Sequence, residues 1–261
     1  MLELDLMFFA LAGPAVLFAG ISKGGFGSGA AFAGAAILAL AVEPGLALAV
    51  MLPMLMLIDV ATLRPFWRQW NWPEARVLIM GSVPGVVAGA FLYARADADL
   101  IRVLIGLIAV FFVFWQLAVS RGLIRARKSP LGLGAGLVAG AVAGFTSFVS
   151  HAGGPPAAAY LLSRGLGKTQ YQATTVIVFF VVNIAKFVPY AALGMFTKET
   201  ALANIALVPF ALVGAWLGVK AHRVIPERLF FALAYVLLLL TGFSLLYQGF
   251  TWSLSGIFAV R

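Results

Sequence analysis

The chain has 261 residues, a formal net charge of +9, 63% hydrophobic and only 10% charged residues, and a mean hydropathy of +1.04. Soluble domains are about 45–50% apolar and roughly 25% charged, so this composition excludes a soluble protein and predicts an integral membrane protein. Cysteine is absent and histidine occurs twice, which excludes disulfides and disfavours a metal centre. The basic residues lie in short loops between apolar runs, a pattern typical of membrane topology rather than nucleic-acid binding.

A helix needs roughly 20 mostly apolar residues to cross a bilayer. In chain order, six uninterrupted runs are long enough: Pro44–Leu63, Ala75–Ala94, Asp99–Val119, Tyr171–Leu193, Thr200–Ala221 and Glu227–Gln248. The longer regions Leu4–Val42 and Leu131–Leu162 are interrupted by Gly- and Pro-rich breaks at residues 20–30 and 146–156, because such clusters form poor continuous helix. We therefore predict an all-α polytopic protein with 8–10 transmembrane segments, depending on whether the breaks are helix pairs or re-entrant loops.

The sequence of the first half recurs in the second half at an offset of about 125 residues. Val83-Pro84 matches Val208-Pro209, and the stretch 89–92 matches 214–217. Five segments per half would make the second repeat inverted, whereas four would make it parallel. We prefer the inverted arrangement, because it places most of the 18 basic residues on one side, as the positive-inside rule requires. The predicted units are a first repeat (1–120), a basic cytoplasmic linker (121–130), a second repeat (131–248) and a C-terminal tail (249–261).

The two breaks are the first candidate site. Backbone left unpaired inside a bilayer costs several kcal/mol per group unless it faces protein or a water-filled cavity. Helix N-termini at such breaks offer free N–H groups and partial positive charge, which favours binding of an anion. An alternative is that the glycines only allow close helix packing. The predicted substrate-binding residues in the breaks are Ser22, Lys23, Gly24, Gly25, Gly27, Ser28, Gly29, Ser147, Ser150, His151, Gly153 and Gly154.

The ionisable residues inside the apolar runs are the second set of candidates, because intramembrane charge is costly and marks functional sites. Lys186, with Asn183 one turn before it, is predicted to bind substrate, or alternatively to form a structural ion pair with Asp59. Asp59 or His151 could carry a coupled proton. Lys23 could instead be a topology charge at a membrane edge, and His151 a neutral side chain satisfied by the backbone.

The paired breaks, Gly20–Gly29 and Gly144–Pro156, together with the chain length and the basic central linker, resemble the sulfite exporter TauE/SafE family of bacterial membrane proteins. The first break departs from the family pattern, since Ser28 interrupts its glycines and the stretch Ala35–Leu38 lacks the proline that follows them in the family. The resemblance implies a multi-pass protein of the bacterial inner membrane that exports a small anion, such as sulfite, an organosulfonate like sulfoacetate, or a related carboxylate.

We therefore predict a secondary transporter that works by alternating access between its halves. We expect the protein not to be an enzyme and to have no cofactor or metal. Its expected partners are a small anion and membrane lipid, and not nucleic acid. A homodimer is one candidate assembly. Two alternatives are an intramembrane enzyme acting on a lipid phosphate or headgroup, and a passive anion channel. The identity of the anion, the direction of transport and the coupling ion are not readable from the residues.

Overall fold

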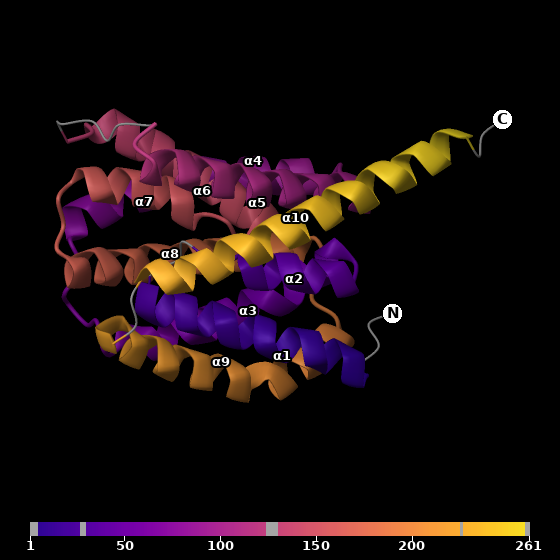
Figure 1. Cartoon of the computed structure of the whole chain (residues 1–261), viewed down its shortest axis with the longest axis horizontal. Coiled ribbons are helices and arrows are strands. Elements are labelled where there is room, and N and C mark those ends of the chain that lie inside the picture. The colour runs from indigo at the N-terminus through magenta and orange to yellow at the C-terminus, as the bar shows by residue number, and fades with distance from the viewer. Residues whose placement is uncertain (1–4, 27–29, 124–129, 225–226, 259–261) are drawn as a thin grey trace.

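The computed structural model describes residues 5–26, 30–123, 130–224 and 227–258; at 223–224, 227–230 and 252–258 it describes the backbone alone. Apolar helices build this described part of the chain. Eight helices within these residues are long and apolar enough to cross a membrane. Together with two shorter helices they form a bundle whose two termini lie at the same end (Figure 1). The prediction of an all-α polytopic membrane protein is confirmed.

The first half contains α1 (Leu6–Ile21) with a π-helical turn η1 (Ser22–Phe26), then α2 (Ala33–Ala41), α3 (Pro44–Leu63), α4 (Trp72–Tyr93) and α5 (Ala98–Ser120). The second half contains α6 (Leu133–Ser150), α7 (Gly154–Ser163), α8 (Lys168–Ala192), α9 (Lys198–Val224) and α10 (Glu227–Phe258). The short helices α2 and α7 each follow a predicted break. With nine and ten residues they are too short to cross a bilayer alone.

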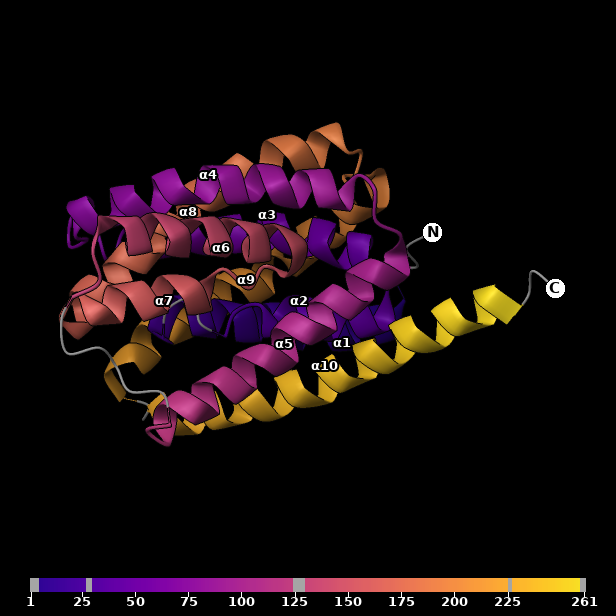
Figure 2. The ribbon, with the colours of Figure 1, turned by 90° about the horizontal axis from the view of Figure 1, so that it is seen from above.

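Long helices of one half pack against those of the other. The contacts α1–α9 and α4–α6 occupy corresponding places in the two halves, as do α3–α9 and α4–α8. Helix α5 runs beside α10 along one edge of the bundle (Figure 2). Helix α1 starts at the end where the chain termini lie, whereas α6 starts at the opposite end (Figure 1). The inverted-repeat relation stays a prediction, and these contacts and directions are what it would produce.

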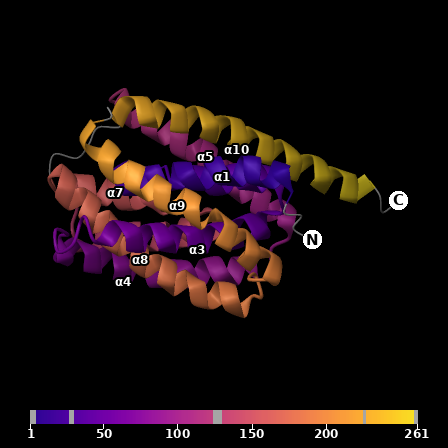
Figure 3. The ribbon, with the colours of Figure 1, turned by 90° about the horizontal axis from the view of Figure 1, so that it is seen from below.

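Helix α3 lies at the centre of the bundle and is its most deeply buried span, with 61% of its apolar window buried. It contacts α8 and α9, and the view from below shows it between these two helices (Figure 3). Large apolar side chains on the outer helices are exposed instead, including Met80, Phe91 and Phe111. That is the surface that hydrocarbon chains would cover, so the polar groups of α3 and α8 are placed in the interior.

The helix boundaries differ from the sequence predictions at three places. The first break remains helical through Phe26 as the π-helical turn η1, and residues 27–29 lie outside the described residues. The second break is narrower than 146–156, because Pro155 and Pro156 lie in the first turn of α7, where a missing N–H costs nothing. Helix α10 continues beyond Gln248 to Phe258, since no proline ends it.

Candidate functional site

The first break delivers a lysine into the protein interior. Ser22, Lys23, Gly24 and Gly25 are all buried in η1, a π-helical turn of the kind often found at functional sites. The Lys23 ammonium lies 2.6 Å from Asp59 Oδ1 on α3, with 3% and 0% of the two side chains exposed. Lys23 is therefore not a charge at a membrane edge, and it forms a buried ion pair between the first break and the central helix.

Asp59 is held on both carboxylate oxygens. Asn183 on α8 donates a hydrogen bond from Nδ2 to Asp59 Oδ2 over 2.7 Å, while Oδ1 faces Lys23. The alternative prediction of an ion pair between Asp59 and Lys186 is wrong, because Asp59 forms its ion pair with Lys23. Asn183 and Asp59 nevertheless join α3 to α8, so the carboxylate links elements of both halves.

The second break ends α6 with a left-handed residue. His151 has φ 57°, and its backbone N–H donates to the Ser147 carbonyl over 3.0 Å, while that of Ala152 donates to Thr146 over 3.2 Å. The His151 bond is that of an αL motif, in which the left-handed residue after the helix donates to the carbonyl four residues earlier, a position usually taken by glycine. Ser150 donates its hydroxyl back to Thr146, and Gly153 and Gly154 lie buried where α7 begins.

Lys186 reaches from α8 to this helix end. Its ammonium group donates to the Ser147 carbonyl at 3.0 Å and lies 2.9 Å from both Ser147 Oγ and His151 Nδ1. Among the described residues it makes no ion pair with a carboxylate. The side chain is fully buried. The carboxyl end of a helix carries partial negative charge, so α6 stabilises a cation here without supplying a counterion.

The hydrogen bonds of His151 define its tautomer. Its Nε2 lies 3.2 Å from the carbonyl oxygen of Leu48, which can only accept, so Nε2 carries the proton. Nδ1 then accepts from the Lys186 ammonium. His151 is therefore a neutral imidazole in this arrangement, and it bridges α3 and α8. This arrangement corresponds to the alternative of a neutral side chain that is hydrogen-bonded to the backbone.

The glycines of the first break lie against α9. A Cβ on Gly24 would come within 2.7 Å of the Ala215 carbonyl oxygen, and one on Gly25 within 2.5 Å of that of Gly218. Close helix packing therefore explains both residues, which was the alternative considered from the sequence. Their role in substrate binding stays a prediction, and Gly27, Ser28 and Gly29 lie outside the described residues.

Two contacts of this region involve groups that the sequence marks weakly or not at all. Gln172 on α8 donates from Nε2 to the Lys23 carbonyl over 2.5 Å, and its buried Oε1 has no hydrogen-bond partner among the described residues. The available signal for Gln172 was an amide near the start of the apolar run Tyr171–Leu193. The backbone carbonyl of Leu48 gave none, because every residue carries one.

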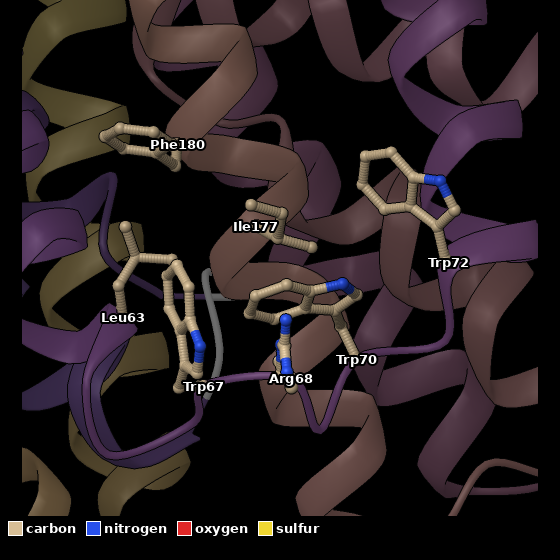
Figure 4. Close-up of a pocket in the computed structure, with 7 residues that line it drawn as sticks. All are labelled: Leu63, Trp67, Arg68, Trp70, Trp72, Ile177 and Phe180. Atoms are coloured by element: carbon tan, nitrogen blue, oxygen red, sulfur yellow. The ribbon is translucent and has the colours of Figure 1, made fainter.

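A second polar cluster lies elsewhere, where α4 meets α7. Glu74 accepts a 2.5 Å hydrogen bond from the Tyr160 hydroxyl and a 2.8 Å bond from Arg164 Nε. It borders a pocket of about 420 Å³. A larger surface pocket, of about 540 Å³, lies at the α3–α4 turn (Figure 4). Neither pocket is lined by Lys23, Asp59, His151 or Lys186, and these four buried groups form what we call the interior cluster.

The interior cluster combines two lysines, one carboxylate and a neutral histidine at the meeting point of two interrupted helices. Charges this deep in a membrane mark a pathway for an ion or a small polar solute. With eight apolar spans around them, they define a polytopic membrane transporter.

Comparison with known proteins gives the same class. The sulfite exporter TauE/SafE family model matches residues 12–245, and the chain belongs to this family. The family is one of transporters rather than enzymes, which sets aside the intramembrane enzyme alternative, and it supports the expected location as a multi-pass protein of the inner membrane. No curated protein and no solved structure gives a significant match to the chain.

Proposed function

We propose that this transporter exports a small monoanion, such as sulfite, an organosulfonate like sulfoacetate or a small carboxylate, and binds it at the interior cluster. The observation that carries the proposal is the charge of that cluster. Lys23 and Lys186 are both buried, and Asp59 is the only carboxylate that faces either of them among the described residues. An anion would therefore complete the charge balance in a region where an uncompensated charge is expensive.

Lys186 is the better placed of the two lysines to receive the anion. All of its acceptors are neutral, so an anion can replace one of them without leaving another charge unpaired. Lys23, by contrast, must give up Asp59 before it can bind an anion. If Lys23 turns to the substrate, Asp59 loses its counterion and gains affinity for a proton. This exchange would couple anion binding to proton uptake.

Alternating access would follow from movement of one half against the other. The supporting observations are the matching contacts α1–α9 and α4–α6 and the opposite directions of α1 and α6. The cluster lies between elements of both halves, with Lys23 and Asp59 in the first and Lys186 and His151 in the second. Separation of the halves would open it to one side at a time. A homodimer stays a prediction.

The test is flux in proteoliposomes with the variant Lys186→Met. We expect loss of substrate-dependent flux with the protein still folded, because methionine keeps most of the volume and the Ser147 carbonyl keeps its bond from His151. Lys198→Met is the matched control, since Lys198 is exposed at the start of α9 and should keep full activity. Normal flux by Lys186→Met would refute the proposed role.

The substrate can be narrowed by thermal shift before flux is measured. A ligand that binds the native state stabilises it by about 2.7 kcal/mol at a hundredfold excess over Kd. The panel would contain sulfite, sulfate, thiosulfate, sulfoacetate, taurine, isethionate, lactate and phosphate. A shift with one anion that Lys186→Met removes would identify the substrate. Saturable exchange of labelled for unlabelled anion would then exclude the passive channel.

A further inference from the structure

The turn between α3 and α4, together with the first residue of α4, presents three tryptophans near an arginine. Trp67, Trp70 and Trp72 line the pocket of about 540 Å³ with Arg68. The remaining lining is apolar and comes from Leu63 at the end of α3 and from Ile177 and Phe180 on α8. The rings of Trp67 and Trp70 lie edge to face with centroids 5.5 Å apart, and Figure 4 shows Arg68 beside the Trp70 ring, with Phe180 toward the other end of the groove. We call this pocket the tryptophan groove.

The polar groups of the tryptophan groove have no partner within the part of the chain that the structure describes. The ion pairs among the described residues use Lys23, Arg102 and Arg164, which leaves Arg68 without a carboxylate. No hydrogen bond within the described residues uses an indole N–H of the three tryptophans, and Trp67 and Trp72 are 59% and 46% exposed. The groove therefore offers a guanidinium and several N–H donors to something outside the chain.

The turn holds these side chains in place. Phe66 is buried with its ring 5.8 Å from that of His222, and the Asn71 N–H donates to Thr174 Oγ1 on α8 over 2.9 Å. Arg68 itself has φ 60°, a conformation that costs a non-glycine residue about 1–2 kcal/mol. The anchored residues on both sides hold Arg68 in this conformation and fix the start of its side chain at the groove.

The groove fits an amphiphile better than a soluble anion. Its charge is at the turn, and its apolar wall continues along α8 into the membrane. Ile177 and Phe180 are nine and twelve residues from the start of α8 at Lys168, which is about 13–18 Å of helix. Tryptophan is enriched at the headgroup level of membrane proteins, and arginine in the loops on the cytoplasmic side.

We propose that the tryptophan groove binds an anionic phospholipid of the inner leaflet, with its phosphate at Arg68 and an acyl chain along Leu63, Ile177 and Phe180. The turn lies at the end of the bundle where α5 leaves for the basic linker, the predicted cytoplasmic side (Figure 1). Anionic lipid is attracted to basic groups there. This site is separate from the interior cluster, and its occupant is not the transported anion.

Quenching of tryptophan fluorescence by brominated lipid tests the proposal directly. The chain has six tryptophans, so a background in which Trp115, Trp216 and Trp252 are phenylalanine leaves only those of the groove. In liposomes with increasing mole fractions of brominated lipid, we expect phosphatidylglycerol to quench at about a five-fold lower mole fraction than phosphatidylcholine. Arg68→Gln should remove this preference. Arg121→Gln, an exposed arginine after α5 and outside the groove, should retain it.

Equal quenching by the two lipids, or an unchanged preference in Arg68→Gln, would overturn the proposal. Relief of quenching by millimolar sulfite would also overturn it, because the groove would then be an entrance for the soluble anion. If the triple phenylalanine background does not fold, native mass spectrometry of the unaltered chain and of Arg68→Gln counts retained phosphatidylglycerol instead. Loss of retained lipid in Arg68→Gln supports the site, and equal retention refutes it. Neither readout depends on transport.

Discussion

Two ion pairs of the same length provide a sharp test of how burial governs the energetics of this protein. Lys23–Asp59 and Arg102–Asp99 both have N–O distances of 2.6 Å. The first pair is 3% and 0% exposed, and the second is 22% and 29% exposed. Distance alone would give the pairs equal strength, whereas burial predicts different costs when one partner is removed.

Lys23→Met leaves the Asp59 carboxylate in the interior with Asn183 as its remaining partner. Breaking a buried pair in this way costs about 3–5 kcal/mol, because the stranded charge is not hydrated. Asp99→Asn removes a pair that water already screens, so we expect about 0.2–1 kcal/mol. In the double variant Lys23→Met/Asp59→Asn no charge is stranded, and most of the stability lost in Lys23→Met should return.

The measurement is the free energy of unfolding in detergent micelles at pH 8 for the parent chain and the three variants. The reasoning is refuted if Lys23→Met costs no more than Asp99→Asn. It is also refuted if the double variant is no more stable than Lys23→Met, because the loss would then come from packing of the lysine stem rather than from the stranded carboxylate.

Two further predictions concern packing between the halves. Gly85→Ala should destabilise the fold by about 1–3 kcal/mol, because its Cβ would collide with the Ala141 carbonyl on α6. A Cβ on Gly134 meets nothing within 4 Å, so Gly134→Ala should be neutral or stabilising by up to about 1 kcal/mol. Thermal unfolding compares the two variants, and equal Tm values would contradict the packing argument. Tyr160→Phe removes the hydroxyl that donates to Glu74 and should cost about 1.5–3 kcal/mol, as for other hydrogen bonds to charged groups. Chemical denaturation measures this loss, and a cost near zero would mean that the Glu74 cluster does not hold α7 to α4.

The sequence determined the class of the protein and the positions of its helices, because both depend on local composition. Apolar runs such as Pro44–Leu63 and Glu227–Gln248 begin where the observed helices α3 and α10 begin, since the bilayer sets the length and capping residues set the start. The same local reasoning identified Lys23, Asp59, His151, Asn183 and Lys186, because an ionisable or amide group in an apolar run is visible without a structure.

The partners of those groups were decided by the tertiary structure. Asp59 pairs with Lys23 and not with Lys186, although the sequence places all three at membrane depth. Which side chains meet depends on how each helix is rotated about its own axis and on where the neighbouring helix lies. No local pattern in a helix with apolar residues on all sides specifies that rotation. The left-handed His151, the close approach of Gly25 to α9 and the tryptophan groove depend on such contacts, so they became visible only when the helices were packed together.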